Sequence, residues 1–185
     1  METENYEKKL ISIVRNQKWL METLKAVRDL DLPDWYIAAG AIRNTVWNRL
    51  HNYPGDINMK DMDVVYFDPN DLSISLEKEC ESKLSSLFPK LIFEVINQAR
   101  AHTFNHRPKA TSSHDSIAYW CETPTCVGVR LEKDDSLTIC APYGLEDLFE
   151  LRVRPIPPLK RDMKLYKERI ESKQWDKTWP RLQIS

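Results

Sequence analysis

The sequence predicts a domain of the α/β (α+β) class, in which helices pack on a central sheet. Over the first hundred residues, short apolar runs bounded by turn residues alternate with segments of helical periodicity. This alternation is typical of strands that are connected by helices. The second half is less regular and contains a predicted hairpin. The length of 185 residues allows a sizeable core and excludes two large domains, so we expect a single domain over residues 1–185.

The N-terminal helical segment, residues 3–30, is expected to form one or two amphipathic helices, because its apolar residues recur on one helical face. Pro33 ends this segment. Residues 35–40 form a short apolar run that predicts a strand ending at Gly40, and residues 41–51 return to helical spacing. A strand, a tight turn and a helix therefore follow one another directly.

The sheet core is expected to extend from about residue 35 to residue 141. Residues 62–67 and 91–96 predict buried strands, and the helical spacing over 72–87 predicts the helix that connects them. Turn residues between two short apolar runs predict a hairpin over 126–141. The C-terminal segment, residues 144–185, is then expected to be mainly helical.

Composition and charge narrow the functional classes. The chain has 27 Lys and Arg against 28 Asp and Glu, so its net charge of −1 provides no global field for a polyanion. We expect no membrane span and a cytoplasmic location, because the chain has no long apolar run and its first residues are polar. The four cysteines form no Cys-x-x-Cys pair and predict buried reduced thiols. Nothing in the sequence indicates the oligomeric state.

Asp61 and Asp63 are the strongest candidates for metal ligands. They lie two residues apart at the start of a predicted strand, so both carboxylates point to the same side. Two like charges in this arrangement favour a cation, and Mg²⁺ prefers oxygen ligands. The alternative is a pair of solvated acids at the beginning of a strand.

Gly40 lies between a predicted strand and a predicted helix. The backbone N–H groups that follow it, on Ala41, Ile42 and Arg43, are expected to be free for an anionic phosphate. The Arg43 guanidinium can add further donors. The alternative is an ordinary turn without a ligand.

Glu94 is the one charged residue in a strand that is expected to be central and covered on both faces. A buried carboxylate requires a metal or a basic partner, so the alternatives are a metal ligand and a buried salt bridge. Asn97, Arg100 and His102 follow this strand, and we expect them at the sheet end where the carboxylates gather. These residues could bind substrate there. The alternatives are that they form hydrogen bonds within a turn or are ordinary surface residues.

The region between residues 152 and 169 is rich in basic side chains. It contains seven basic residues and only two acidic ones, Asp162 and Glu168. Such a stripe can hold phosphates of a nucleotide or RNA, and its alternative is a solvated helix face. The seven basic residues are Arg152, Arg154, Lys160, Arg161, Lys164, Lys167 and Arg169.

The order of these motifs resembles the DNA polymerase beta-like nucleotidyltransferase superfamily, and it is more closely similar to a group of bacterial nucleotidyltransferase-like proteins. The shared pattern is a strand, a glycine and a helix, then Asp-x-Asp on a strand and a third acid on a later strand. The resembling text is Ala39-Gly40-Ala41-Ile42-Arg43-Asn44, Asp61-Met62-Asp63-Val64, Glu94-Val95-x-Asn97-Gln98-Ala99-Arg100-x-His102, Trp120-x-Glu122-Thr123, Val127-Gly128-Val129-Arg130, Ala141-Pro142-Tyr143-Gly144-Leu145-x-Asp147-Leu148 and Trp179-Pro180.

The resemblance implies a nucleotidyltransferase fold with a mixed central sheet, and it implies an enzyme. Asp61, Asp63 and Glu94 would be catalytic and would hold Mg²⁺, with Mn²⁺ as the alternative ion. The substrate would be a nucleoside triphosphate whose monophosphate is moved to a hydroxyl acceptor. We expect a small-molecule acceptor rather than RNA, because the chain is neutral and lacks an extended basic surface. The residues expected to bind the nucleotide are Gly40, Ala41, Arg43, Asn97, Arg100 and His102.

The sequence departs from the superfamily pattern in four places. Ala41 stands where a second Gly or Ser is usual, Asn44 replaces an acid, and nineteen residues separate Ala41 from Asp61. The third acid, Glu94, is longer than the usual aspartate. These departures keep two alternatives open, a catalytically silent nucleotide- or protein-binding module and a phosphohydrolase that uses the same carboxylates.

Overall fold

The structure is a computed structural model that describes residues 2–54, 59–103, 107–158 and 163–185. Its main sheet is five-stranded, with the spatial order β3-β2-β1-β4-β5. The β2–β3 pair is parallel, and the other neighbouring pairs are antiparallel. The predicted mixed sheet is therefore confirmed. Its strands are β1 (Tyr36–Ala38), β2 (Asp61–Tyr66), β3 (Ile92–Asn97), β4 (Gly128–Leu131) and β5 (Leu137–Cys140).

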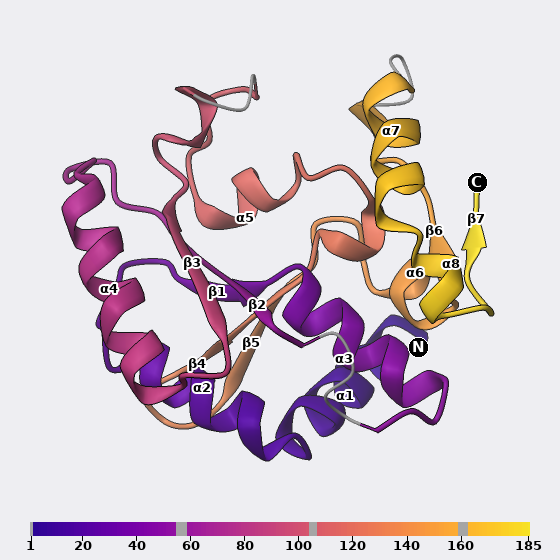
Figure 1. The fold of residues 1–185 in the computed structure, drawn as a ribbon, viewed down its shortest axis with the longest axis horizontal. Coiled ribbons are helices and arrows are strands. Elements are labelled where there is room, and N and C mark those ends of the chain that lie inside the picture. The colour runs from indigo at the N-terminus through magenta and orange to yellow at the C-terminus, as the bar shows by residue number, and fades with distance from the viewer. Residues whose placement is uncertain (1, 55–58, 104–106, 159–162) are drawn as a thin grey trace.

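Four helices belong to the first half of the chain. The predicted N-terminal segment consists of α1 (Glu2–Arg15) and α2 (Lys18–Arg28), which lie on one side of the sheet (Figure 1). Helix α3 (Gly40–Leu50) follows β1 directly, as expected. Helix α4 (Ile74–Leu87) connects β2 to β3 and packs against β3. This connection explains why β2 and β3 are parallel, since a crossover helix returns the chain to the same edge.

The second half is built from shorter elements. Helices α5 and α7 lie on the opposite side of the sheet from α1 and α2 (Figure 1). A second sheet, which the sequence did not predict, pairs two short strands in parallel. The elements are α5 (Ser113–Ile117), α6 (Glu146–Phe149), β6 (Arg152–Val153), α7 (Lys164–Lys173), α8 (Trp175–Thr178) and β7 (Gln183–Ile184), with 3₁₀ turns at Ala101–Thr103 and Thr123–Thr125.

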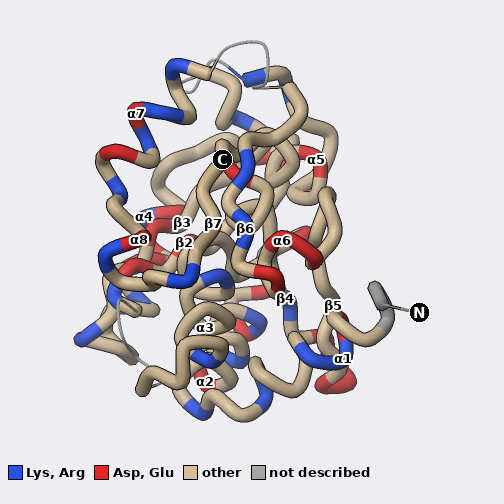
Figure 2. The backbone as a smooth tube through the Cα atoms, turned by 90° about the vertical axis from the view of Figure 1, so that its right-hand side faces the viewer, with Lys and Arg blue, Asp and Glu red and all other residues tan. Residues whose placement is uncertain are grey.

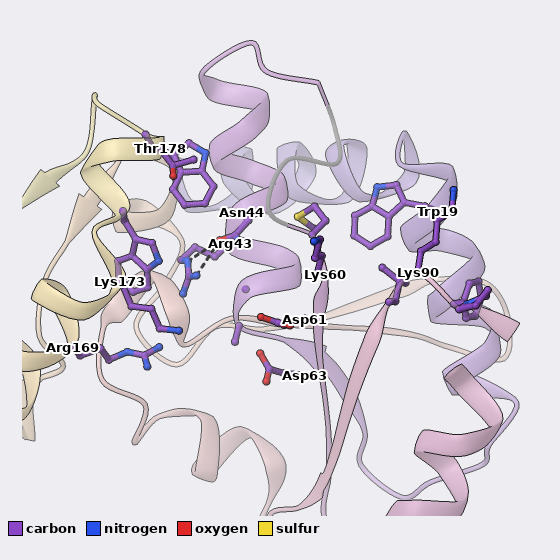
Figure 3. A pocket seen from close by; sticks show the side chains of 18 of the residues that line it. Trp19, Arg43, Asn44, Lys60, Asp61, Asp63, Lys90, Arg169, Lys173 and Thr178 are labelled. Atoms are coloured by element: carbon purple, nitrogen blue, oxygen red, sulfur yellow. Dashed lines mark hydrogen bonds between the residues drawn. The ribbon is translucent and has the colours of Figure 1, made fainter. Parts of the chain in front are cut away.

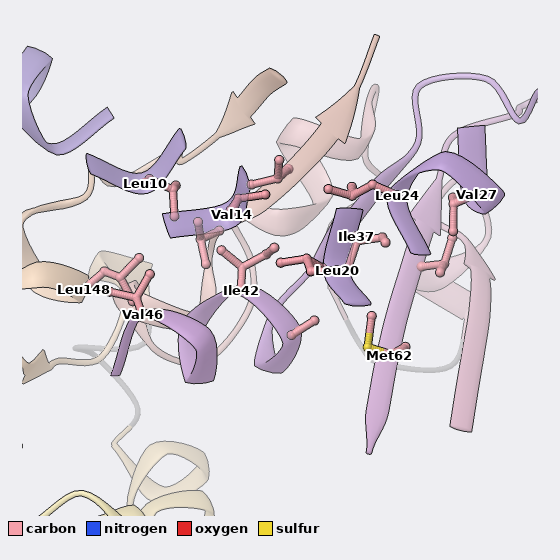
Figure 4. Close-up of a cluster of buried hydrophobic side chains, with 14 of the residues drawn as sticks. Leu10, Val14, Leu20, Leu24, Val27, Ile37, Ile42, Val46, Met62 and Leu148 are labelled. Atoms are coloured by element: carbon pink, nitrogen blue, oxygen red, sulfur yellow. The ribbon is translucent and has the colours of Figure 1, made fainter. Parts of the chain in front are cut away.

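The main core forms between the N-terminal helices, α3 and the sheet (Figure 4). Leu10 and Leu24, from α1 and α2, are fully buried together with Ile42 of α3 and Ile37 of β1. Burying a side chain of this size contributes about 1.5–3 kcal/mol relative to leaving it exposed. The helical periodicity of residues 3–30 therefore marked a true core face.

The C-terminal tail is attached to α3 through tryptophans. The rings of Trp175 and Trp179 lie edge-on to Trp47, with centroids 5.6 and 5.1 Å away. The Trp179 indole also donates a hydrogen bond to Asn48 Oδ1 at 2.9 Å. These contacts hold α8 and the residue that follows it against the C-terminal half of α3, although more than a hundred residues separate them in sequence.

All four cysteines are buried free thiols, as predicted. Burial raises the pKa of Cys121 and of Cys140 to about 12, so neither thiol ionises near neutral pH.

Within the described residues, no helix combines the length and the apolar character that crossing a bilayer requires.

The prediction that residues 91–96 form a central strand covered on both faces is wrong. β3 is an edge strand. Phe93 and Val95 are buried on the face that α4 covers, whereas Glu94 is exposed and Ile92 is 62% exposed on the other face. Two isoleucines on the uncovered face made the run look apolar on both sides. Glu94 therefore needs no buried partner to balance its charge.

Candidate active site

The register between β2 and β3 brings the three predicted carboxylates to one place. Asp63 lies directly beside Glu94 in the parallel pairing, and Asp61 lies two residues earlier on the same face of β2. Figure 3 shows Asp61 and Asp63 next to each other, pointing into a cavity. Asp61 and Glu94 are exposed, and Asp63 is partly buried.

The surroundings of Asp63 disfavour its ionised form. Burial and the neighbouring charges of Glu94 and Asp61 together raise the pKa of Asp63 to about 6, against the charge of Arg43, which lowers it. The negative charge is therefore only partly compensated by the protein. A cation between the carboxylates would relieve it.

The donor set fits a hard divalent cation. Within the described part of the chain, Asp61, Asp63 and Glu94 form no hydrogen bond or ion pair, so their oxygens are free. No group of three or more His, Cys, Asp and Glu side chains, among the residues described, stands close enough to enclose an ion by itself. Mg²⁺ commonly takes one or two carboxylates and completes its shell with water and substrate phosphates. Asp61 and Asp63 supply the two carboxylates that such a site uses.

A cavity of about 950 Å³ opens beside the aspartates. This volume suits a nucleotide, since ligand cavities span about 300–1,000 Å³. One wall comes from the first turn of α3, a second from α7 and α8, and a third from the segment that leads into β3 (Figure 3). Five basic side chains line the cavity, namely Arg43, Lys60, Lys90, Arg169 and Lys173.

The lysines at the cavity are available for a ligand. Lys60, Lys90 and Lys173 are exposed, and none of them forms an ion pair within the described residues. They approach from two sides: Figure 3 shows Lys173 on the α7 wall, and Lys60 and Lys90 across the cavity from it. A polyphosphate placed between the two walls would meet cations on both sides.

The N-terminus of α3 faces the same cavity through Gly40. The amides of Gly40, Ala41 and Ile42 have no acceptor within the described part of the chain, which confirms the prediction for Ala41 and Ile42. The prediction was wrong for Arg43, whose N–H donates to the Ala39 carbonyl at 2.9 Å and closes the first turn of the helix. Ala39, just before the helix, has φ +49° and ψ −122°, a conformation that L residues rarely adopt. Its N–H donates to the Val127 carbonyl at 2.9 Å, which fixes the direction of the turn. A strained turn thus directs a helix N-terminus toward the aspartates.

Arg43 is more deeply held than predicted. Its guanidinium is buried and lies 4.2 Å from the Trp175 ring centroid. Three of its N–H groups are used, one toward Thr125 Oγ1 at 2.7 Å and two toward Asn44 Oδ1 at 3.0 and 3.2 Å. Burial lowers its pKa to about 10, so it remains charged at neutral pH. Arg43 therefore contributes a fixed positive charge close to Asp63 and retains few donors for a ligand.

The structure does not bring Asn97 and Arg100 to the carboxylates. Asn97 is fully buried at the far end of β3, and its Nδ2 donates to the carbonyls of Asp68 and Asp71 at 2.7 Å each. Arg100 Nε donates to Glu77 of α4 at 3.0 Å. The expectation was wrong because the acids gather in the first half of the parallel strands, whereas Asn97 ends β3 about 10 Å farther along and Arg100 follows the strand.

His102 is also outside the cavity that the aspartates line. It belongs to the 3₁₀ turn Ala101–Thr103 and is partly buried. Its location follows from the same misplacement of the strand end.

Of the five stripe residues that the structure describes, three are engaged away from the cavity. Arg152 and Arg154 hydrogen-bond to the buried Asp147 at 2.5–3.0 Å. Lys164 lies 3.8 Å from Glu168, and residues 160 and 161 lie outside the described residues. Basic and acidic positions alternate along α7 (Figure 2). Of the stripe, Arg169 lines the cavity.

Sequence reasoning missed Lys60, Lys90 and Lys173. Each is an isolated lysine in a polar context, so no local pattern distinguishes it from a surface charge. A buried acid also escaped notice: Glu122, 0% exposed, accepts a hydrogen bond from Arg169 Nε. The Glu122-containing motif was part of the family resemblance, which is the signal that could have identified it.

Comparisons with known proteins agree with this geometry. A family model described as nucleotidyltransferase matches residues 25–184. A solution structure reported to reveal a CCA-adding enzyme head domain is 34% identical, with a TM-score of 0.85, over 96% of this chain and 95% of that one. No curated protein sequence matches the chain.

Larger enzymes share the fold at lower identity. The Thermotoga maritima CCA-adding enzyme complexed with tRNA is 14% identical with a TM-score of 0.58, and a CCA-adding enzyme in complex with CTP is 13% identical with the same score. The match covers 96–97% of this chain and 42–43% of those enzymes. On the family model and the 34% identical structure, the chain belongs to the nucleotidyltransferase family, with the polymerase beta-like fold.

Proposed function

We propose that the protein is a Mg²⁺-dependent nucleotidyltransferase that moves a nucleoside monophosphate from a nucleoside triphosphate to a hydroxyl acceptor. The observation that carries this proposal is the pair Asp61 and Asp63, with Glu94 beside Asp63, at a cavity whose other charged lining residues are all basic. Acids with free oxygens beside a basic cavity suit a metal–triphosphate complex. They do not suit a purely apolar or purely acidic ligand.

Asp61 and Asp63 would hold the metal, and Glu94 stands next to Asp63 to contribute a further oxygen. When bound, Mg²⁺ supplies positive charge that stabilises the attacking and departing oxygens of an in-line displacement. The ionised form of Asp63 is disfavoured without a cation, which supports its role as a ligand.

The triphosphate would lie across the N-terminus of α3. The free amides of Gly40 and Ala41 can donate to its oxygens, and the helix end favours negative charge. Lys173 and Arg169 on one wall and Lys60 on the other can neutralise the β- and γ-phosphates.

In the transfer step, the acceptor oxygen attacks the α-phosphorus and forms a new P–O bond. The bond from the α-phosphorus to the oxygen that bridges to the β-phosphate breaks, and pyrophosphate leaves with that electron pair. The proton of the acceptor hydroxyl passes to the carboxylate of Glu94, which is exposed beside Asp63. The atoms and charges of the step balance without a further reactant.

The related CCA-adding enzymes were solved with tRNA and with CTP, which supports a nucleoside triphosphate as one substrate. For the acceptor we propose a small molecule. The net charge of −1 provides no general attraction for a long polyanion, and Arg152 and Arg154 of the basic stripe are paired with Asp147.

The first test is calorimetric titration of the protein with each nucleoside triphosphate, with and without Mg²⁺. Asp63→Asn is compared with Asp31→Asn, which makes the same change at an exposed position far from the cavity. The proposal expects metal-dependent binding that Asp63→Asn loses and Asp31→Asn retains. Failure of every triphosphate to bind would favour a module that has the fold without the chemistry. Release of inorganic phosphate instead of pyrophosphate would favour a phosphohydrolase.

A further inference from the structure

A second cavity, of about 320 Å³, lies on the other side of Asp63 from the triphosphate cavity. Asp63, Ala39 and Arg169 line both cavities, and Glu94 lines the second. The second cavity lies on the face of the sheet opposite α1 and α2, where Val65 of β2 and Ile96 of β3 line it. Two separate spaces therefore meet at the carboxylates.

The second cavity contains a cation that has no direct hydrogen-bonding partner within the described residues. Arg107 is partly buried and lines the cavity, and it forms no hydrogen bond or ion pair within the described residues. Burial lowers its pKa, and the charge of Arg169 lowers it further. The charge of Glu122 acts on Arg107 without a direct contact, so the guanidinium N–H groups remain available to a negatively charged ligand group.

The lining of the second cavity carries both kinds of charge. Its acids are Asp63 and Glu94, and its cations are Arg107 and Arg169. The rest of the lining is largely apolar. It includes Trp120, Ile96 and Leu165.

The second cavity is small for a ligand site. From Glu94 to Gln98, both of which line the cavity, four strand steps span about 13 Å. A volume of about 320 Å³ is at the lower end of the range for ligand cavities. The space accommodates a small molecule and encloses little of a longer polymer.

We propose that the second cavity is the acceptor site, and that it selects a small acceptor that carries a hydroxyl group and an anionic group, a carboxylate or a phosphate, at its opposite end. The hydroxyl lies at Asp63 and Glu94, where it faces the α-phosphate across the carboxylates, and the anionic group binds Arg107. This inference rests on the proposed function, because it names the substrate class of the same site.

Two sets of probes test the assignment. Glycerate and glucuronate carry a carboxylate, glycerol 3-phosphate and glucose 6-phosphate carry a phosphate, and glycerol and glucose are their uncharged counterparts. Each is incubated with the full chain, Mg²⁺ and an α-labelled triphosphate, beside a short RNA with a free 3′-hydroxyl. The proposal expects label on anionic small molecules and none on uncharged ones. Comparison of the two acid series identifies which anionic group is used.

Variants of Arg107 make the test specific. Arg107→Met is expected to lower kcat/KM for the anionic acceptor by roughly tenfold to a hundredfold, chiefly through KM, because a charge-assisted hydrogen bond is lost. Arg107→Lys should recover part of the loss. Triphosphate affinity should be unchanged in both variants. Lys109→Met, at an exposed position two residues later, is the matched control.

Direct binding separates this inference from the proposed function. Calorimetry of the same anionic probes without nucleotide should detect binding that Arg107→Met loses. If the anions bind but no triphosphate does, the proposed function fails and the anion site stands. If triphosphate binds but RNA alone is labelled, if neutral and anionic probes are labelled equally, or if no anionic probe binds, the acceptor assignment is overturned.

Discussion

Arg169 of α7 donates a hydrogen bond to Glu122, whose carboxylate is completely buried. The other oxygen of Glu122 has no hydrogen-bond partner within the described residues. Arg169 in turn lines both cavities that meet at Asp63. A buried acid from the middle of the chain thus orients a cation from the C-terminal helix toward the candidate active site.

Glu122→Gln should weaken triphosphate binding while the protein stays folded. The variant keeps the shape of the side chain but removes the charge that holds Arg169, so we expect the Kd to rise about 5- to 30-fold. Calorimetry with Mg²⁺ and each triphosphate measures the effect. Glu168→Gln on α7 removes an exposed acid and should change little. Equal behaviour of the two variants would contradict a positioning role for Glu122.

Asp63→Asn should stabilise the metal-free protein at neutral pH. The pKa of Asp63 is raised from 3.8 to about 6 in the folded state, so the folded protein binds more protons than the unfolded chain between these values, and its stability falls as pH rises through them. Removing the carboxylate should raise the free energy of unfolding by about 1–3 kcal/mol at a pH of about 7.5. The gain should vanish near pH 4. Urea unfolding in the presence of a chelator measures both values.

Urea unfolding in the presence of Mg²⁺ tests whether Asp63 holds the metal. Added Mg²⁺ should stabilise the wild type and leave Asp63→Asn unchanged, because binding to the folded state alone shifts the unfolding equilibrium. Asp31→Asn should behave as the wild type throughout. A variant that is less stable than the wild type at both pH values would show that Asp63 has a structural role instead.

Gly40→Ala should separate folding from binding. A methyl group at Gly40 would meet the nearest atoms, Arg43 Nη2 and Asn44 Nδ2, at 3.8 Å, which is ordinary contact. Stability should therefore be unchanged or raised by up to about 1 kcal/mol. The methyl group would nevertheless stand at the cavity, between the phosphates and the helix amides, so we expect roughly tenfold weaker triphosphate binding.

Gly144→Ala is the comparison variant, because it should lower the stability of the protein, whereas Gly40→Ala should lower the affinity for triphosphate. Gly144 has φ +74°, and a methyl group there would collide with the Glu146 carboxylate. We expect this variant to lose stability by about 1–3 kcal/mol, whether or not ligand is present. Thermal unfolding distinguishes the two variants. Unchanged triphosphate affinity in Gly40→Ala would argue against phosphate binding at α3.

Lys173→Ala should lower triphosphate affinity in a salt-dependent way. Lys173 is exposed at the cavity wall, so its contribution is a screened attraction that we expect to be about two- to fivefold in Kd at low salt. The difference from wild type should shrink as ionic strength rises. Lys177→Ala, on an exposed position of α8 that does not line the cavity, is the control. A loss that persists in high salt would indicate a different cause.

Local patterns in the sequence were sufficient to predict the elements around the site. The apolar run that ends at Gly40 and the Asp61–Asp63 spacing depend only on neighbouring residues, and both features are present in the structure as expected. Periodicity also identified the buried face of α1 and α2. Such signals are readable because they repeat at the period of one helix or one strand.

Long-range arrangement decided the rest. Whether Glu94 is buried, and which residues stand beside it, depends on β3 being an edge strand and on its parallel register with β2. The same register placed Asn97 and Arg100 away from the acids. No periodicity along a strand reports which neighbour it will pair with.

The sequence by itself determined the strand–glycine–helix turn and the spacing of the aspartate pair. It also determined the near-zero net charge and the family resemblance. Only the tertiary structure decided that Arg169 and Lys173 would line the cavity at Asp63 from the far end of the chain, and that Arg107 would be partly buried in the second cavity. The physical reason is that an isolated basic residue is locally identical to a solvated surface charge. Its function arises from the charges and cavities that folding brings next to it.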